Sequence, residues 1–159
     1  MSKSIGPQLR KYWHLLSGWP GGKWLFSQAI GFIAPYSGSI SASVIELRPG
    51  FGVVQLREHR RVRNHLRSVH AIALVNLAEI TTGLTLMNSL PDNTRGILTA
   101  IQMNYLKKAR GLLTAKCSCE IPPDNSTREI TLQGEIKNTE GEVVATASAQ
   151  WLVGAESEK

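Results

Sequence analysis

The segment VHAIALVNLAEITTGLTLM, residues 69–87, contains one charged side chain, that of Glu79. Its apolar residues lie all round a helix instead of along one stripe, which is typical of a helix buried in the middle of a protein. A helix of this kind needs a sheet curled around it and a second subunit over the part that the sheet leaves open. We therefore expect residues 69–87 to form the central helix of the fold.

The residues on both sides of this helix have the pattern of strands. From Ser39 the apolar residues alternate with polar ones until Arg48-Pro49-Gly50, and a second strand follows over 52–60. After the helix come four runs in meander spacing, separated by turn residues: 96–105, 112–121, 128–137 and 142–152. The sequence predicts an α+β fold with an antiparallel sheet of about six strands around one helix.

The domain organisation follows from these elements. Residues 1–36 are expected to form an N-terminal extension of two helical pieces, separated at Trp19-Pro20-Gly21-Gly22, with the apolar side of the second piece packed on the body or on a partner subunit. Residues 37–153 form the main domain, and 154–159 are expected to be a disordered tail. The apolar segment 24–36 has only 13 residues, and a membrane span needs about 20. We expect no membrane span and a cytoplasmic location.

Composition limits the partners of the protein. The chain has 159 residues, 42% of them hydrophobic and 19% charged, and a formal net charge of +6. This charge suits a nucleic acid, an anionic lipid surface or a phosphate-bearing ligand. Nucleic acid is disfavoured because the basic stretch 57–67 contains no aromatic residue.

The two cysteines, Cys117 and Cys119, are expected to point the same way along one strand. This arrangement is poor for a disulfide, and two ligands are too few for zinc. We expect free thiols in a reducing compartment and no metal site. The sequence has no Gly-x-Ser-x-Gly motif, which excludes the serine-hydrolase mechanism built on that turn.

A motif around the start of the central helix carries a family resemblance. Asn64 precedes His70 by six residues, and Glu79 follows His70 by nine. A second match is Asn-Tyr-Leu-Lys-Lys-Ala-Arg-Gly at 104–111. Over roughly residues 39–153 the chain resembles the hotdog-fold thioesterases of the phenylacetate-pathway (PaaI-like) type. A hotdog dehydratase is disfavoured because that chemistry pairs a histidine and an acid across a longer spacing.

The resemblance implies hydrolysis of an acyl-CoA, with no cofactor apart from the coenzyme A of the substrate. It implies that Glu79 is the catalytic acid, acting as general base or nucleophile, that Asn64 helps to hold water or substrate, and that His70 is the histidine at the helix start. Ala71 and Ile72 replace a Gly-Gly pair whose backbone N–H groups bind the thioester oxygen. The alternative is a non-catalytic protein that binds acyl-CoA or an acyl carrier.

Further residues are predicted to bind the substrate. Asn76 and Thr82 lie three residues either side of Glu79, so we expect the three to line a polar slot on one helical face. Basic side chains are candidates to hold the phosphates of coenzyme A: Arg60, Arg61, Arg63, Lys107, Lys108 and Arg110.

The resemblance also implies a site shared between subunits, with Asn64 and His70 from one and Glu79 from the other. Nine residues of helix rise about 13 Å, too far for one small thioester group to touch His70 and Glu79 of the same chain. We therefore expect a homodimer or a dimer of dimers.

Overall fold

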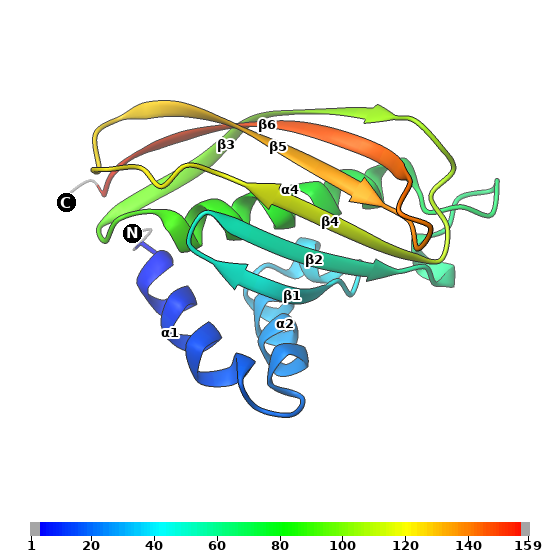
Figure 1. The fold of residues 1–159 in the computed structure, drawn as a ribbon, viewed down its shortest axis with the longest axis horizontal. Coiled ribbons are helices and arrows are strands. Elements are labelled where there is room, and N and C mark those ends of the chain that lie inside the picture. Colours follow the sequence, from blue (N-terminus) through cyan, green and yellow to red (C-terminus); the bar gives the residue numbers. More distant parts are fainter. Residues whose placement is uncertain (1–3, 157–159) are drawn as a thin grey trace.

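A computed structural model describes residues 4–156 as one antiparallel sheet of six strands wrapped around the helix α4, Ala71–Ser89 (Figure 1). Three helices precede the sheet. The predicted α+β hotdog fold is confirmed. The other elements, in chain order, are α1 Gly6–Ser17, α2 Gly22–Ile33, α3 Pro35–Gly38, β1 Ser43–Arg48, β2 Phe51–Arg57, the short 3-10 helix η1 Arg60–Val62, β3 Thr94–Tyr105, β4 Leu112–Ser118, β5 Arg128–Lys137 and β6 Val143–Ala155.

The strand order is β1-β2-β4-β5-β6-β3, so the predicted meander of four strands is wrong at β3. β3 pairs with β6 along its whole length, from Thr94 opposite Ala155 to Tyr105 opposite Ala145. β4 instead lies between β2 and β5. A short connection of turn residues is compatible with a hairpin or with a crossing to another part of the sheet, so spacing alone could not separate the two.

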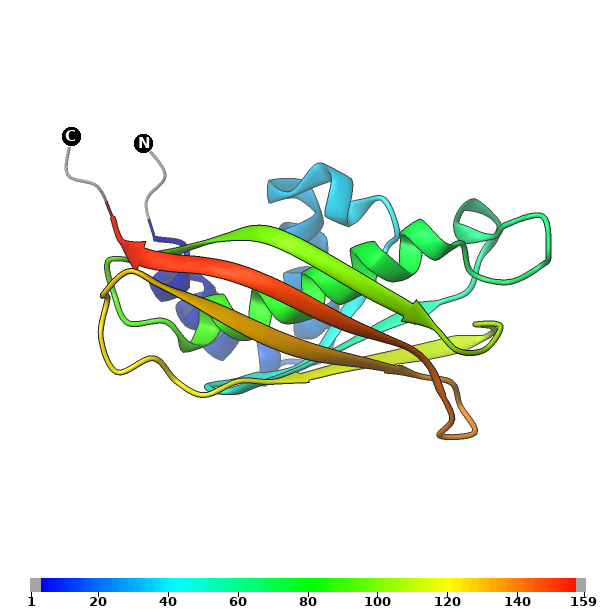
Figure 2. The same cartoon turned by 90° about the horizontal axis from the view of Figure 1, so that it is seen from above.

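The helix α4 is covered on both sides within one chain. The sheet packs on one side, and α1 and α3 contact the helix from outside the sheet, with α3 on the side away from β5 and β6 in Figure 2. Leu77 and Leu86 are completely buried. Among residues 4–156, α4 is the one helix long and apolar enough to cross a membrane, but it is mostly buried, like a core helix. The burial of α4 therefore does not require the second subunit expected from the sequence, because the N-terminal helices supply much of the cover.

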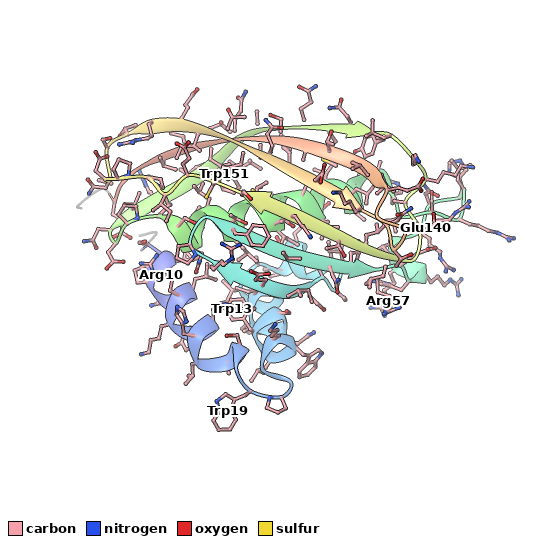
Figure 3. All side chains as sticks on the ribbon, in the orientation of Figure 1. Arg10, Trp13, Trp19, Arg57, Glu140 and Trp151 are labelled. Carbon is pink, nitrogen blue, oxygen red and sulfur yellow. The ribbon has the colours of Figure 1, made fainter. Side chains whose placement is uncertain are left out.

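The helices α1 and α2 form a hairpin that is anchored to the body. Trp13 and Phe26 meet edge to face with their ring centroids 5.0 Å apart, and both are buried. Arg10 donates to the backbone oxygen of Leu90 and forms an ion pair with Asp92 just after α4. Figure 3 shows Trp13 at the inner part of the hairpin and Trp19 at its outer end. The hairpin is therefore a fixed wall beside α4.

The strand β6 continues to Ala155, two residues beyond the domain end expected at 153. β4 ends at Ser118, earlier than predicted, shortly before two prolines that lack the N–H groups a ladder needs. Residues 157–159 of the expected disordered tail lie outside the described residues.

Candidate active site

Three segments meet at the N-terminus of α4. The ring nitrogen Nδ1 of His70 accepts a hydrogen bond from the Ile72 N–H at 3.1 Å, which caps the helix. The His70 N–H donates to the Val62 oxygen at 2.7 Å, and the Val69 N–H donates to the Ala109 oxygen at 2.8 Å. The loops 60–69 and 106–111 are thereby held around the positive end of the helix dipole.

Asn64 organises the first of these loops. Its side-chain oxygen Oδ1 accepts from the Leu66 N–H at 2.9 Å, and from the N–H and the hydroxyl of Ser68 at 3.2 Å each. Asn64 also lines a cavity of about 330 Å³ beside Ala71 and Tyr105. The predicted water-holding residue thus lies at the predicted end of the helix, and its oxygen is already occupied by the loop.

The Ile72 N–H, one of the two predicted oxyanion donors, already has a hydrogen-bond partner. The Ile72 N–H bonds to the His70 ring, so a substrate oxygen must compete with the imidazole for that donor. The Ile72 side chain is 52% exposed and lines, with His70 and Asn76, a second cavity of about 240 Å³. The side chains that replace the glycine pair therefore line two different cavities, Ala71 the first and Ile72 the second.

Half of the predicted phosphate-binding side chains are engaged within the chain. Arg63 forms an ion pair with Glu58 at 2.6 Å, Lys107 forms one with Glu142, and Arg110 donates to the Arg67 oxygen at 3.0 Å. The other three are exposed and have no ion pair within residues 4–156: Arg60, Arg61 and Lys108. These three contribute unpaired positive charge near the start of α4.

Glu79 lies two and a half helical turns beyond His70, and it lines a third cavity, of about 600 Å³. Its carboxyl oxygen Oε2 accepts a hydrogen bond from the Ser37 hydroxyl at 3.5 Å, which is long. Burial raises the pKa of Glu79 above its ordinary value of 4.5, and the hydrogen bond from Ser37 opposes that shift. No ion pair involves Glu79 in the described part of the chain. A half-buried carboxyl without a cation, with a raised pKa, has the properties of a general base.

The prediction that Asn76 and Thr82 line a polar slot together with Glu79 is wrong. Asn76 donates to the Tyr36 oxygen at 3.1 Å, and the fully buried Thr82 donates to the Ala78 oxygen at 2.9 Å. The Thr82 methyl group faces Gly134 of β5. At 100° per residue the two side chains lie about 60° from Glu79 in opposite directions. Asn76 therefore supports the turn at α3, Thr82 faces the sheet, and only Glu79 faces the large cavity.

Sequence reasoning missed Ser37 and the walls of the large cavity. α1 and α2 contribute Tyr12, Leu16, Ile30 and Ile33 to its lining. The apolar side of the second N-terminal helix was the one available signal, and it predicted packing on the body without indicating a cavity. Ser37 lies in a one-turn helix after a proline and belongs to no motif.

The cysteines are free, as predicted. Burial, assisted by the neighbouring Cys119, raises the pKa of the Cys117 thiol to about 12, so this thiol is protonated at neutral pH and is no nucleophile. Within residues 4–156 no group of three or more His, Cys, Asp or Glu side chains could hold a metal ion.

Solved structures with similar folds extend over most of the chain. A structural-genomics protein designated APC5556 is 30% identical, with a TM-score of 0.80 and coverage of 95% of this chain and 99% of that one. A protein of unknown function from Pseudomonas aeruginosa, named a probable thioesterase, is 19% identical, with a TM-score of 0.72 and coverage of 84% and 93%. A hypothetical thioesterase protein from Streptococcus pneumoniae TIGR4, solved with coenzyme A, is 24% identical, with a TM-score of 0.61 and coverage of 73% and 91%.

No curated protein matches the sequence. The similar solved structures confirm the hotdog fold, whereas membership of the phenylacetate-pathway branch stays a prediction. The family match covers residues 22–153, so it begins with α2 and includes Glu79 and all of the sheet except the last two residues of β6. The chain therefore belongs to the family described as Domain of unknown function (DUF4442).

Proposed function

We propose that the protein is a thioesterase that hydrolyses an acyl-CoA, or a similar acyl thioester, to a free acid and a thiol. The observation that carries the proposal is Glu79, a half-buried carboxyl with a raised pKa that faces a cavity of about 600 Å³ and has no cation beside it within residues 4–156. Hydrolysis of a thioester needs a base or nucleophile, donors for the developing oxyanion, and a positioned water.

The reaction follows one of two routes. As a general base, Glu79 takes a proton from water while the water oxygen bonds to the thioester carbonyl carbon; the C–S bond then breaks and the thiolate receives a proton. As a nucleophile, a Glu79 carboxylate oxygen bonds to the thioester carbonyl carbon, the C–S bond breaks, and the thiolate leaves and receives a proton. Water then cleaves the resulting anhydride to the free acid and the Glu79 carboxylate. In both routes negative charge develops on the carbonyl oxygen, for which the N–H groups of Ala71 and Ile72 at the positive end of α4 are the proposed donors.

The proposed substrate contains coenzyme A because of the charge at the same end of α4. Arg60, Arg61 and Lys108 are exposed there without ion-pair partners in the described residues, and guanidinium and ammonium groups bind phosphate well. The Streptococcus pneumoniae protein of similar fold was solved with coenzyme A. Such a substrate is consistent with a cytoplasmic location, which we also propose.

The site is proposed to combine two subunits of a homodimer, or of a dimer of dimers. Within one chain Asn64, His70 and Glu79 line three different cavities. A two-fold axis beside antiparallel α4 helices brings the start of one helix near the middle of the other. Asn64 and His70 then come from one subunit and Glu79 from its partner.

The test is the variant Glu79→Gln, assayed with acyl-CoA substrates. We expect an unchanged fold and a fall in kcat of about a hundredfold or more, because the amide keeps the shape of the carboxyl but cannot accept a proton from water. Turnover at the parent rate would falsify the assignment of Glu79.

A second candidate function is binding of acyl-CoA or an acyl carrier without hydrolysis. The observation in its favour is that Ala71 and Ile72 carry side chains where the thioesterase motif has glycines, while the Ile72 N–H is occupied by His70. Calorimetry and a turnover assay on the same preparation separate the two functions. Tight binding of acyl-CoA without any release of thiol would favour the binding protein.

A further inference from the structure

The large cavity beside Glu79 has a composition that suits a hydrocarbon chain. Three helices supply its apolar walls: Tyr12 and Leu16 from α1, Ile30 and Ile33 from α2, and Leu84 and Met87 from α4. Among residues 4–156, Glu79 is the only charged side chain in the lining. A ligand group seated against these walls therefore gains by burying apolar surface.

A glycine lies beside Glu79 in the lining of this cavity. A Cβ atom at Gly83, one turn along α4, would lie 3.9 Å from the Glu79 oxygen Oε1 and 3.1 Å from the Trp151 ring. Gly83 and Gly96 both belong to the lining. The missing side chain of Gly83 leaves the space beside the carboxyl open, so that a group seated in the cavity can reach it.

The volume indicates the size of that group. A methylene group occupies roughly the space of a water molecule, about 30 Å³ in the liquid, so a chain of about 12 to 16 carbons needs about 360–480 Å³. The cavity of about 600 Å³ holds such a chain. A short acyl group would leave most of the apolar wall without contacts, which makes it a poor match.

The outer walls exist before any ligand arrives. The Trp13–Phe26 contact and the bonds of Arg10 to the Leu90 oxygen and to Asp92 hold the α1–α2 hairpin in place. A preformed site of this kind loses less conformational freedom on binding than one that must order.

We infer that the α1–α2 hairpin is the acyl-binding element of this protein and that the acyl group is a long aliphatic chain, lying between the hairpin and α4 with its thioester end at Glu79. This inference rests on the proposed function for the reacting end and adds the class of acyl group and the element that selects it.

The experiment compares hydrolysis of butanoyl-, octanoyl-, dodecanoyl- and hexadecanoyl-CoA by the parent and by Ala29→Trp. Ala29 lines the cavity and is exposed in it, so the indole fills space without disturbing the core. We expect the parent to prefer the two longest substrates. In the variant we expect kcat/KM for hexadecanoyl-CoA to fall about tenfold or more, with octanoyl-CoA little changed, because contacts to the distal methylenes are lost.

Two further variants complete the design. Ile33→Trp places the same side chain elsewhere in the lining, at a residue that is 70% exposed, and should give the same shift if Ala29→Trp folds poorly. Leu25→Trp is the matched control on the same helix, because Leu25 is 50% exposed and lies outside this lining. The control should keep the chain-length profile of the parent.

Binding separates this inference from the proposed function. Calorimetry should show that Ala29→Trp weakens the binding of dodecanoyl-CoA and leaves the binding of free coenzyme A unchanged. This result is expected even if no hydrolysis is found. A parent that prefers butanoyl-CoA would overturn the inference. A chain-length profile that stays the same in both cavity variants would also overturn the inference. This includes the outcome in which the variants change only the oligomeric state, because a partner subunit then fills the cavity.

Discussion

At the scale of single residues, Glu79 links activity to pH. Burial raises its pKa above the ordinary 4.5, and a general base acts only when it is deprotonated. We therefore expect turnover to fall as the pH falls through the raised pKa, and the acid side of the pH profile to lie above pH 4.5. The profile of kcat/KM for an acyl-CoA measures this. An acid limb at or below the ordinary carboxyl value would contradict a buried base.

The same carboxyl makes the stability of the fold depend on pH. A pKa that is higher in the folded state than in the unfolded chain contributes stability below the unfolded value, and that contribution is lost as the pH rises through the folded value. Glu79→Gln removes the titration, so we expect the variant to gain stability over the parent as the pH rises above 4.5. Urea unfolding of both proteins at acid and neutral pH tests this, and a constant difference between them would show that the carboxyl is solvated.

His70 has a structural role that can be separated from a catalytic one. Its ring caps α4, so His70→Ala should lower the free energy of unfolding by about 1 kcal/mol, the usual effect of losing a cap. Serine caps well, and His70→Ser should restore that stability. We expect the serine variant to remain impaired in turnover, because it lacks an imidazole that lines the cavity at the helix start. Full recovery of turnover would mean that His70 acts only as the cap.

At the scale of elements, the contact between β2 and α4 depends on a glycine. A Cβ atom at Gly52 would lie 2.2 Å from the Thr85 hydroxyl oxygen, and Thr85 is completely buried. We expect Gly52→Ala to destabilise the protein by about 1–3 kcal/mol, as overpacking of a core does. Gly134→Ala is the matched control, since its Cβ would meet Ala147 and Thr82 at an ordinary 3.6 Å. Equal unfolding midpoints for the two variants would show that β2 can move away from the helix.

At the scale of the whole molecule, the strand at one edge of the sheet bears on assembly. The outer side of β3, a strand of 12 residues, is an unpaired edge within the described chain. An exposed edge of this length is a ready surface for another strand. A homodimer joined there would extend the sheet, and light scattering is expected to give at least twice the chain mass of 17.4 kDa.

A mixing experiment tests whether the site is shared. Asn64→Ala and Glu79→Gln, each inactive alone, are unfolded and refolded together. In a heterodimer one site carries both changes and the other carries neither, so activity should return to about a quarter of the parent level under random pairing. Verified heterodimers that stay inactive would place the whole site within one subunit.

The sequence by itself determined the central helix, the six strands and the position of Glu79 on that helix. These features depend on local patterns: an apolar helix with one charge, alternation in strands, and turn residues between them. The order of these elements, together with the family resemblance carried by Asn64, His70 and Glu79, predicted the hotdog fold, which the similar solved structures confirm.

Only the tertiary structure decided what lies around those residues. The pairing of β3 with β6 joins segments 40 to 61 residues apart, and no local pattern records such a partner. Asn76 and Thr82 share the helix of Glu79 but face other neighbours, because each direction around a helix meets a different element. The large cavity arises where residues of α1 and α2 meet α4, and contacts between distant segments have no period in the sequence, because packing alone brings them together.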